Sequence, residues 1–299
     1  MKVAGLLIDL KTSALLCEQR GDNTLFRLRY ELAGNAIISG KERYIMLATL
    51  MAVPVSVALL IWILRMKKYD PFPRFTFLKL LIFGAIAYAL SGIITLLGGI
   101  INLLMQIGPE QLKLMTDAEG VVKVLQEIAE ASKALTPQSV LIGFIRTFIL
   151  IGLVEELLKF FGAKIVMRKE GVVNTWKDAL LCFAVVAVSF QLIEDIGYAG
   201  SVALAIFRAL TPFHFTFAVI MGYFYGLGKV KGNGFYSLLA IVAPATIHTL
   251  YDYSINLLKR SDNFIFLVLA MNVIMFALTI YAVLKLRKWH RDGDLDIYI

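Results

Sequence analysis

The chain has 299 residues, of which 59% are hydrophobic and 17% are charged, and its mean hydropathy is +0.76. These values exclude a soluble globular domain and indicate an integral membrane protein. The formal charge of +8 does not point to nucleic acid as a partner, because the basic residues stand at the ends of apolar segments. That pattern is typical of a multi-pass protein that follows the positive-inside rule.

The first third of the chain predicts a polar segment followed by two apolar ones. Residues 1–43 are polar, and we expect a small N-terminal segment in which an alternating run at 24–32 forms a strand. Residues 44–64 are long enough to cross a hydrocarbon core of about 30 Å. The basic link at 65–79 is expected on the cytoplasmic side. The next apolar segment, 75–106, is too long for one straight span, so we expect it to bend or end at Gly98 and Gly99.

Residues 107–138 carry five acidic residues against three lysines, so we expect this loop outside the cell. The sequence Thr-Asp-Ala-Glu at 116–119 resembles a capping box, with Thr116 as the cap, and apolar residues follow it at helical spacing. The loop therefore predicts an amphipathic helix. Such a helix could lie on the membrane, cover the bundle, or act as a lid over a site.

Five further apolar segments complete the predicted architecture, at 139–167, 179–199, 202–227, 235–258 and 263–285. If successive segments cross the membrane in alternating directions, their basic ends all fall on the same side. We therefore expect an all-α, polytopic bundle of about seven spanning helices over residues 44–288, with a polar C-terminal tail at 289–299 inside. The alternation places the N-terminal segment outside, although its seven basic residues favour the inside.

Four of the predicted spans contain ionisable side chains at membrane depth, where one charge costs roughly 3 kcal/mol. Each group lies 13 to 17 residues from the nearest cytoplasmic basic residue, which is roughly 20 to 26 Å of helix at ~1.5 Å per residue. Helical spacing also pairs Glu155 with Lys159 and His248 with Asp252. Any one of these groups could be a buried ion pair or a packed histidine. Their common depth instead predicts one site, formed by Glu155, Glu156, Lys159, Glu194, Asp195, His214, His248 and Asp252.

These residue types allow more than one chemistry. A glutamate such as Glu155 could take a proton from water while an acid or histidine opposite stabilises the oxyanion. Glu194, His214 and His248 could instead ligate zinc and leave one position open, with Glu155 as the base. The same layer would also suit a proton-coupled membrane transporter, although no inverted repeat is evident. A non-catalytic scaffold is disfavoured because all the polar positions are filled.

The order of motifs resembles the PrsW family of intramembrane proteases, which is similar to the CAAX prenyl endopeptidases and bacteriocin-processing enzymes. The matching motifs are Glu-Glu-x-x-Lys at 155–159, Phe-x-x-x-Glu at 190–194, His-x-x-x-Asp at 248–252, a segment with Arg208, His214 and Gly222, and the link at 68–73. Together they cover residues 50–258.

The resemblance implies an endopeptidase of the prokaryotic cell membrane that cuts a membrane-anchored protein, of the anti-sigma-factor type in some relatives. It makes Glu155 the leading candidate for water activation, with Glu194 and His214 assisting. His248 and Asp252 would face the oxyanion or a metal, and Glu156 with Lys159 would orient the helix. Glu194 stands where the prenyl endopeptidases have a histidine, which makes prenylated substrates less suitable.

Overall fold

The computed structural model describes residues 53–68, 70–131, 135–169, 171–197 and 211–299. The expected strand at 24–32, the whole N-terminal segment 1–43 and Arg208 lie outside these residues. All regular secondary structure in the described part of the chain is helical, apart from one antiparallel bridge between Thr175 and Tyr298. The predicted all-α membrane bundle is therefore confirmed.

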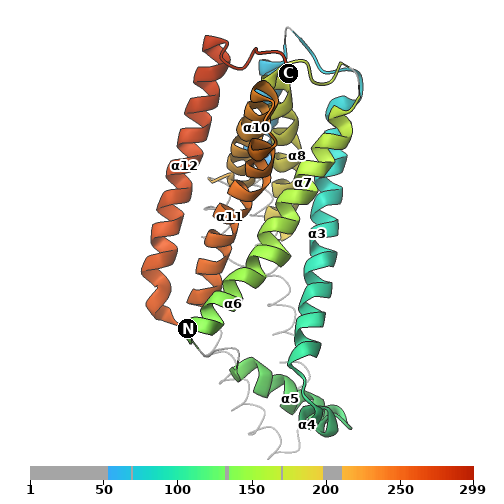
Figure 1. Cartoon of the computed structure of the whole chain (residues 1–299), viewed down its shortest axis with the longest axis vertical. Coiled ribbons are helices and arrows are strands. Elements are labelled where there is room, and N and C mark those ends of the chain that lie inside the picture. The colour runs from blue at the N-terminus through green and yellow to red at the C-terminus, as the bar shows by residue number, and fades with distance from the viewer. Residues whose placement is uncertain (1–52, 69, 132–134, 170, 198–210) are drawn as a thin grey trace, which may run out of the picture.

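The helices follow the apolar segments closely (Figure 1). In chain order they are a first helix Val53–Met66, α3 (Thr76–Gln106), α4 (Pro109–Leu114), α5 (Ala118–Ala131), α6 (Pro137–Thr147), the π-helix η1 (Phe148–Gly152), α7 (Leu153–Met167), α8 (Trp176–Gly197), α10 (Phe213–Lys231), α11 (Gly234–Leu258), the short η2 (Asp262–Phe264) and α12 (Ile265–Asp292). Among the described residues, α3, α8, α11 and the stretch that contains α12 are long and apolar enough to cross a membrane. The count of seven spans stays a prediction.

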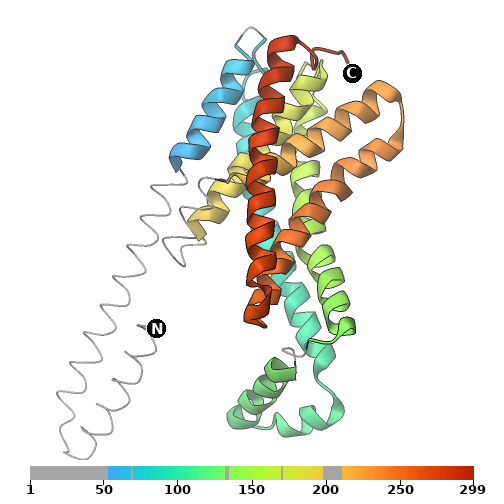
Figure 2. The same cartoon turned by 90° about the vertical axis from the view of Figure 1, so that its left-hand side faces the viewer.

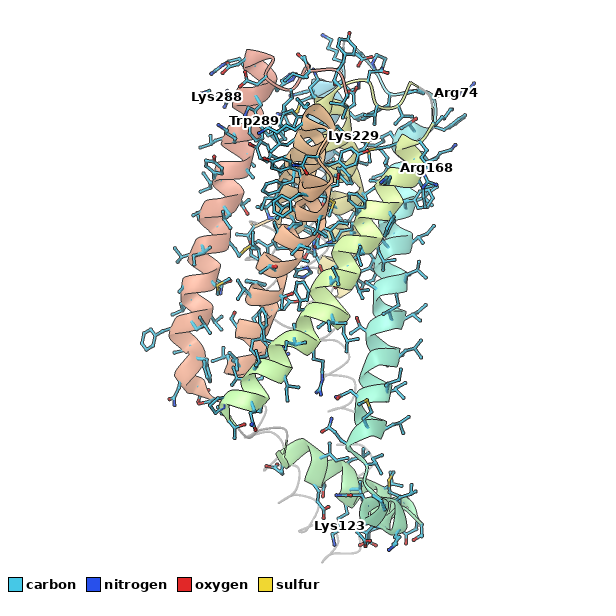
Figure 3. The ribbon with its side chains drawn as sticks, viewed as in Figure 1. Arg74, Lys123, Arg168, Lys229, Lys288 and Trp289 are labelled. Carbon is cyan, nitrogen blue, oxygen red and sulfur yellow. The ribbon has the colours of Figure 1, made fainter. Side chains whose placement is uncertain are left out.

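Basic side chains gather at one end of the bundle. Figure 3 shows Arg74, Arg168, Lys229 and Lys288 at that end, whereas Lys123 of the 107–138 loop lies at the opposite end. Figures 1 and 2 place α4 and α5 at the end away from the C-terminus. This arrangement is the one expected if the basic end faces the cytoplasm.

Helix α8 is the buried centre of the bundle. Its residues from Ala179 to Val188 are almost completely inaccessible, and small residues let its neighbours approach. A Cβ on Gly84 of α3 would lie 2.4 Å from the carbonyl oxygen of Val186, and one on Gly222 of α10 would lie 2.7 Å from the Cα of Leu180. Close approach through small residues is the usual way in which helices associate in lipid, because lipid tails leave no hydrophobic driving force between them.

The start of α8 is held at the basic end of the bundle. The Lys67 ammonium donates to Asp178 Oδ1 at 2.7 Å, and the backbone N–H of Thr175 donates to Asp178 Oδ2 at 2.9 Å. The C-terminal residues pair with the same turn, since the backbone N–H of Trp176 donates to the carbonyl of Ile297 at 2.9 Å. The depth of α8 in the bundle is therefore set by several polar contacts outside its apolar core.

Three local predictions need correction. The predicted single helix at 139–167 is a continuous helical path, but it contains the π-helix η1 between α6 and α7. Helix α3 does not end at Gly98 and Gly99 but continues to Gln106. The cap of the loop helix α5 is Asp117 and not Thr116, because α5 begins at Ala118 and the backbone N–H of Gly120 donates to Asp117 Oδ1 at 2.8 Å.

Candidate active site

Four elements bring the predicted polar side chains together in the interior. Helix α7 contributes Glu155, Glu156 and Lys159, α8 contributes Glu194, α10 contributes His214, and α11 contributes His248 and Asp252. Glu156, Lys159, His214 and His248 are each no more than 4% exposed. The predicted convergence of these residues is therefore present in the structure.

A glycine explains why α7 and α11 approach so closely at this point. A Cβ on Gly152 would lie 2.2 Å from the hydroxyl oxygen of Thr249 and 2.7 Å from the carbonyl oxygen of Ala245. Glu156 lies one turn after Gly152 on the same helix face, and His248 stands next to Thr249. The close contact of the two helices thus places the Glu156 carboxylate beside the His248 ring.

Glu156 and Lys159 form the inner side of the site. The Lys159 ammonium donates to Glu156 Oε1 at 2.7 Å, and His248 Nδ1 lies 3.1 Å from the same oxygen. His214 Nδ1 lies 2.6 Å from the Lys159 Nζ. Lys159 is thus nearer to Glu156 than to its predicted partner Glu155, whose Oε2 is 3.9 Å away. Both histidines therefore turn their Nδ1 atoms toward one buried ion pair.

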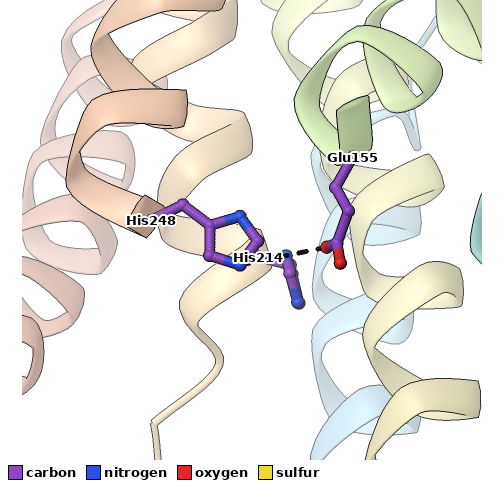
Figure 4. Close-up of side chains that lie close together, drawn as sticks. All are labelled: Glu155, His214 and His248. Carbon is purple, nitrogen blue, oxygen red and sulfur yellow. Dashed lines mark ion pairs between the residues drawn. The ribbon is translucent and has the colours of Figure 1, made fainter. Parts of the chain in front are cut away.

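The Nε2 atoms of both histidines face the remaining carboxylates. His214 Nε2 lies 2.6 Å from Glu194 Oε2. His248 Nε2 lies 3.3 Å from Asp252 Oδ2, which confirms the pairing predicted from helical spacing, and 3.9 Å from Glu155 Oε2. Figure 4 shows Glu155 and His248 facing each other from separate helices, with His214 beside the line that joins them.

Aromatic rings enclose the two imidazoles. Phe217 stacks on His248 with ring centroids 5.1 Å apart, and Phe190 lies 4.9 Å from the His214 ring. The Lys159 ammonium also lies over the Phe190 ring, 4.4 Å from its centroid. Such packing keeps the rings in one orientation and limits water on the inner side, which strengthens each electrostatic contact there.

The structure also assigns a role to Gln191, which the sequence interpretation did not single out. His214 is the second residue of α10, where backbone N–H groups have no partner within the helix. Its N–H donates to Gln191 Oε1 at 3.2 Å, and Gln191 Nε2 donates to Asp195 Oδ2 at 3.3 Å. The sequence held one indication of this role, since Gln191 stands four residues before Asp195 in an otherwise apolar helix.

The donor set fits a divalent cation such as zinc. Candidate ligand atoms of Glu155, His214 and His248 lie within 4.8 Å of one another. Glu155 Oε2 is buried and accepts no hydrogen bond from the described residues. His248 presents Nε2 while its Nδ1 contacts the Glu156 carboxylate, which is the usual outer contact of a metal-bound histidine. Histidine nitrogens and carboxylate oxygens are common zinc ligands.

The charges of the cluster agree with that fit. Four carboxylates, of Glu155, Glu156, Glu194 and Asp252, contact the two histidines, and Lys159 is the cation that the described residues place among them. A divalent cation would offset the excess of negative charge, whose burial is otherwise costly. An ion on His214 Nε2 would also touch Glu194, because those two atoms are only 2.6 Å apart.

The comparison with known proteins agrees with this site. The sequence profile described as PrsW family intramembrane metalloprotease matches residues 73–279. The chain belongs to this family. The match spans every helix that carries a site residue, from α7 to α11. With the apolar helices of the fold, it identifies a multi-pass bacterial membrane protein.

Individual relatives are similar at a moderate level. Protease PrsW of Oceanobacillus iheyensis is 28% identical over 146 residues, which cover 46% of this chain and 66% of the relative. Protease PrsW of Geobacillus kaustophilus is 32% identical over 112 residues, covering 36% of this chain and 50% of the relative. Protease PrsW of Bacillus subtilis is 28% identical over 141 residues, which cover 45% of this chain and 63% of the relative. The chain thus spans half to two thirds of the length of these PrsW relatives. No solved structure matches it.

Proposed function

We propose that this protein hydrolyses a peptide bond of a membrane-tethered protein, of the anti-sigma-factor type, within the bilayer. The observation that supports the proposal is the cluster of Glu155, His214 and His248, whose candidate ligand atoms lie within 4.8 Å of one another. The cluster lies in the interior of a bundle that contains long apolar helices, in a chain of the PrsW family. Family membership favours hydrolysis over the proton-coupled transport that the same residues also allow.

In the proposed reaction Glu155 takes a proton from a water molecule as the water oxygen attacks the carbonyl carbon of the substrate. Breakage of the C–N bond then releases the amine, which receives the proton that Glu155 holds. The products are a carboxylic acid and an amine, and transfer of the acid proton to the amine gives a carboxylate and an ammonium, so atoms and charges balance. The buried Glu155 Oε2 accepts no hydrogen bond from the described residues, so it is available for the proton.

Glu194, His214 and His248 are proposed to hold the metal. A bound zinc ion would supply Lewis-acid polarisation of the carbonyl and a more acidic water. Glu156 and Lys159 are proposed as positioning residues, because they contact the Nδ1 atoms of the histidines and not the open side of the cluster. Asp252 Oδ2 lies 3.3 Å from His248 Nε2, the atom proposed to ligate the metal, so Asp252 is proposed to face the metal side of the cluster.

The test of the function compares membrane proteins of cells that express the wild-type chain or the variant Glu155→Gln. The matched control is Glu110→Gln, since Glu110 is exposed on α4 and pairs only with the nearby Lys113 among the described residues. We expect truncated fragments of a single-span protein with the wild type and with the control, and none with Glu155→Gln or His248→Ala. The same fragments in all four strains would refute the proposal.

The metal content of the purified variants distinguishes the role of Glu194 from the role of Glu155. If Glu194 is a ligand and Glu155 the proton acceptor, Glu194→Gln loses zinc, while Glu155→Gln keeps zinc and loses cleavage. If only Glu155→Gln loses zinc and Glu194→Gln keeps it, Glu155 is the ligand and Glu194 the proton acceptor. Because zinc is counted directly, the assignment does not depend on knowing the substrate.

A further inference from the structure

Helix α3 packs tightly against the bundle at two levels. Toward the basic end, Gly84 lies against Val186 of α8, and the Ser189 hydroxyl donates to the carbonyl of Leu81 at 2.7 Å. Toward the other end, a Cβ on Gly98 would lie 2.7 Å from Leu150 Cδ2. The Thr95 hydroxyl also donates to the carbonyl of Leu150, in the π-helix η1, at 3.1 Å.

Between these two levels a cavity of about 450 Å³ lies beside α3. That volume lies within the range of small-ligand sites. One wall holds the carboxylates of the candidate active site, and the other is made of small and hydroxyl-bearing residues. The lining residues are Tyr88, Ala89, Ser91, Gly92, Thr95 and Leu96 of α3, with Ile151, Glu155, Glu194 and Asp252 opposite.

The cavity is accessible from the side of the bundle. Leu96 lines it and is nevertheless 64% exposed. Gly92 is also exposed, and no atom of the described residues lies within 4 Å of the position that its Cβ would take. Figures 1 and 2 show α3 at the edge of the bundle, beside the path of α6 and α7. In a bilayer, a segment of another membrane protein could reach the cavity from the side of α3 at the level of Gly92 and Leu96.

The α3 wall is suited to an extended backbone. The Ser91 hydroxyl donates to the carbonyl of Tyr88 at 2.8 Å, and the Thr95 hydroxyl donates to Leu150. With its hydrogen used in this way, each hydroxyl oxygen keeps a lone pair that can accept an N–H from a peptide. Such a peptide must be unwound, since the N–H groups of a helix are already bonded within the helix.

We propose that α3 forms the substrate-binding wall of this enzyme and that Gly92 limits the size of the substrate residue beside the cleaved bond. The proposal rests on the proposed function. The substrate class is a single-span protein whose outer half contains small residues of low helix propensity, such as Gly and Ser. Such a segment unwinds at little cost and places a small side chain over Gly92.

Substitutions at two glycines test this role. Gly92→Leu fills the open space over the cavity, whereas Gly99→Leu is the matched control. Gly99 lies two turns further on the same helix face and is also exposed. Within the part of the chain that the structure describes, it has no atom within 4 Å of its Cβ position and does not line the cavity. Neither change meets a neighbouring atom at Cβ, and both replace glycine by a better helix former, so both variants should fold.

The assay uses a synthetic single-span peptide with a Gly- and Ser-rich outer half, reconstituted with the full chain in lipid vesicles. We expect Gly92→Leu to raise KM about tenfold or more, by the usual cost of misfitting methylenes, with zinc content unchanged. Gly92→Ala should fall between Gly92→Leu and the wild type, and Gly99→Leu should match the wild type. Wild-type KM and kcat in Gly92→Leu would overturn the proposal.

A crosslinking measurement keeps this test independent of catalysis. A benzophenone side chain is placed at position 96 or, as control, at position 104, in chains that also carry Glu155→Gln. Leu96 and Leu104 are 64% and 61% exposed, but of these two residues only Leu96 lines the cavity. We expect peptide crosslinks from position 96 and few from 104. Equal yields would overturn the binding role of α3, whereas crosslinks from 96 without any wild-type cleavage would overturn the proposed hydrolysis alone.

Discussion

Replacing Glu156 by glutamine should separate stability from catalysis at this site. Glu156 is 1% exposed and Lys159 is 2% exposed, and 2.7 Å separates their charged atoms. Glu156→Gln leaves the Lys159 ammonium buried beside a neutral amide. Removing one partner of a buried pair costs about 3 to 5 kcal/mol, and the remaining amide oxygen still accepts one hydrogen bond, so we expect a loss of about 3 kcal/mol.

The same substitution should lower activity through His248. His248 Nδ1 lies 3.1 Å from Glu156 Oε1, so the ring loses the carboxylate that orients it. Loss of an outer contact of this kind costs about 10- to 100-fold in metal affinity or activity. We therefore expect zinc affinity or peptide cleavage to fall by that factor in Glu156→Gln.

The double variant with Lys159→Met distinguishes the two effects. It removes the ammonium that has lost its nearest carboxylate, so the half-life of the folded protein in detergent at elevated temperature should recover most of its loss. Cleavage and zinc affinity should remain low, because the His248 contact is still missing. Glu110→Gln on the exposed α4 should change neither quantity. If Glu156→Gln cleaves within about twofold of the wild type, or if the double variant regains activity, the positioning role is wrong.

Three further predictions concern the fold and the metal. Lys67→Met and Asp178→Asn should each shorten the thermal half-life, and the double variant should lose less than the sum of the two losses, with a coupling of about 1 to 3 kcal/mol. Additive losses would show that the Lys67–Asp178 ion pair does not stabilise the start of α8. Gly222→Leu should destabilise the bundle by about 3 kcal/mol in thermal unfolding, because its Cβ meets the backbone of Leu180, whereas Gly99→Leu should not. Chelation with phenanthroline should abolish peptide cleavage and added zinc should restore it; full activity after zinc is removed to below one tenth of an equivalent would exclude the metal role.

Much of the architecture could be predicted because lipid restricts what a chain can do. Long apolar segments must form helices, since no water is present to satisfy exposed backbone groups, and the ends of α3, α8 and α11 follow the predicted ends within a few residues. For the same reason charged residues inside such segments are costly and few, so each of them was a candidate for function. Counting residues along each helix then placed the candidates at one depth.

The rotation of each helix and the closeness of its neighbours were decided only by the tertiary structure. Glu155 and Glu156 are adjacent in sequence, but neighbouring residues point about 100° apart on a helix, so Glu156 faces the buried Lys159 and Glu155 faces the cavity. The π-helix η1, the approach of α7 to α11 at Gly152, and the gap beneath α3 all depend on contacts between distant segments. Composition and spacing determined that a membrane-depth polar site exists. Packing between helices decided which atoms of that site meet, because side-chain direction depends on how the helices are rotated against one another.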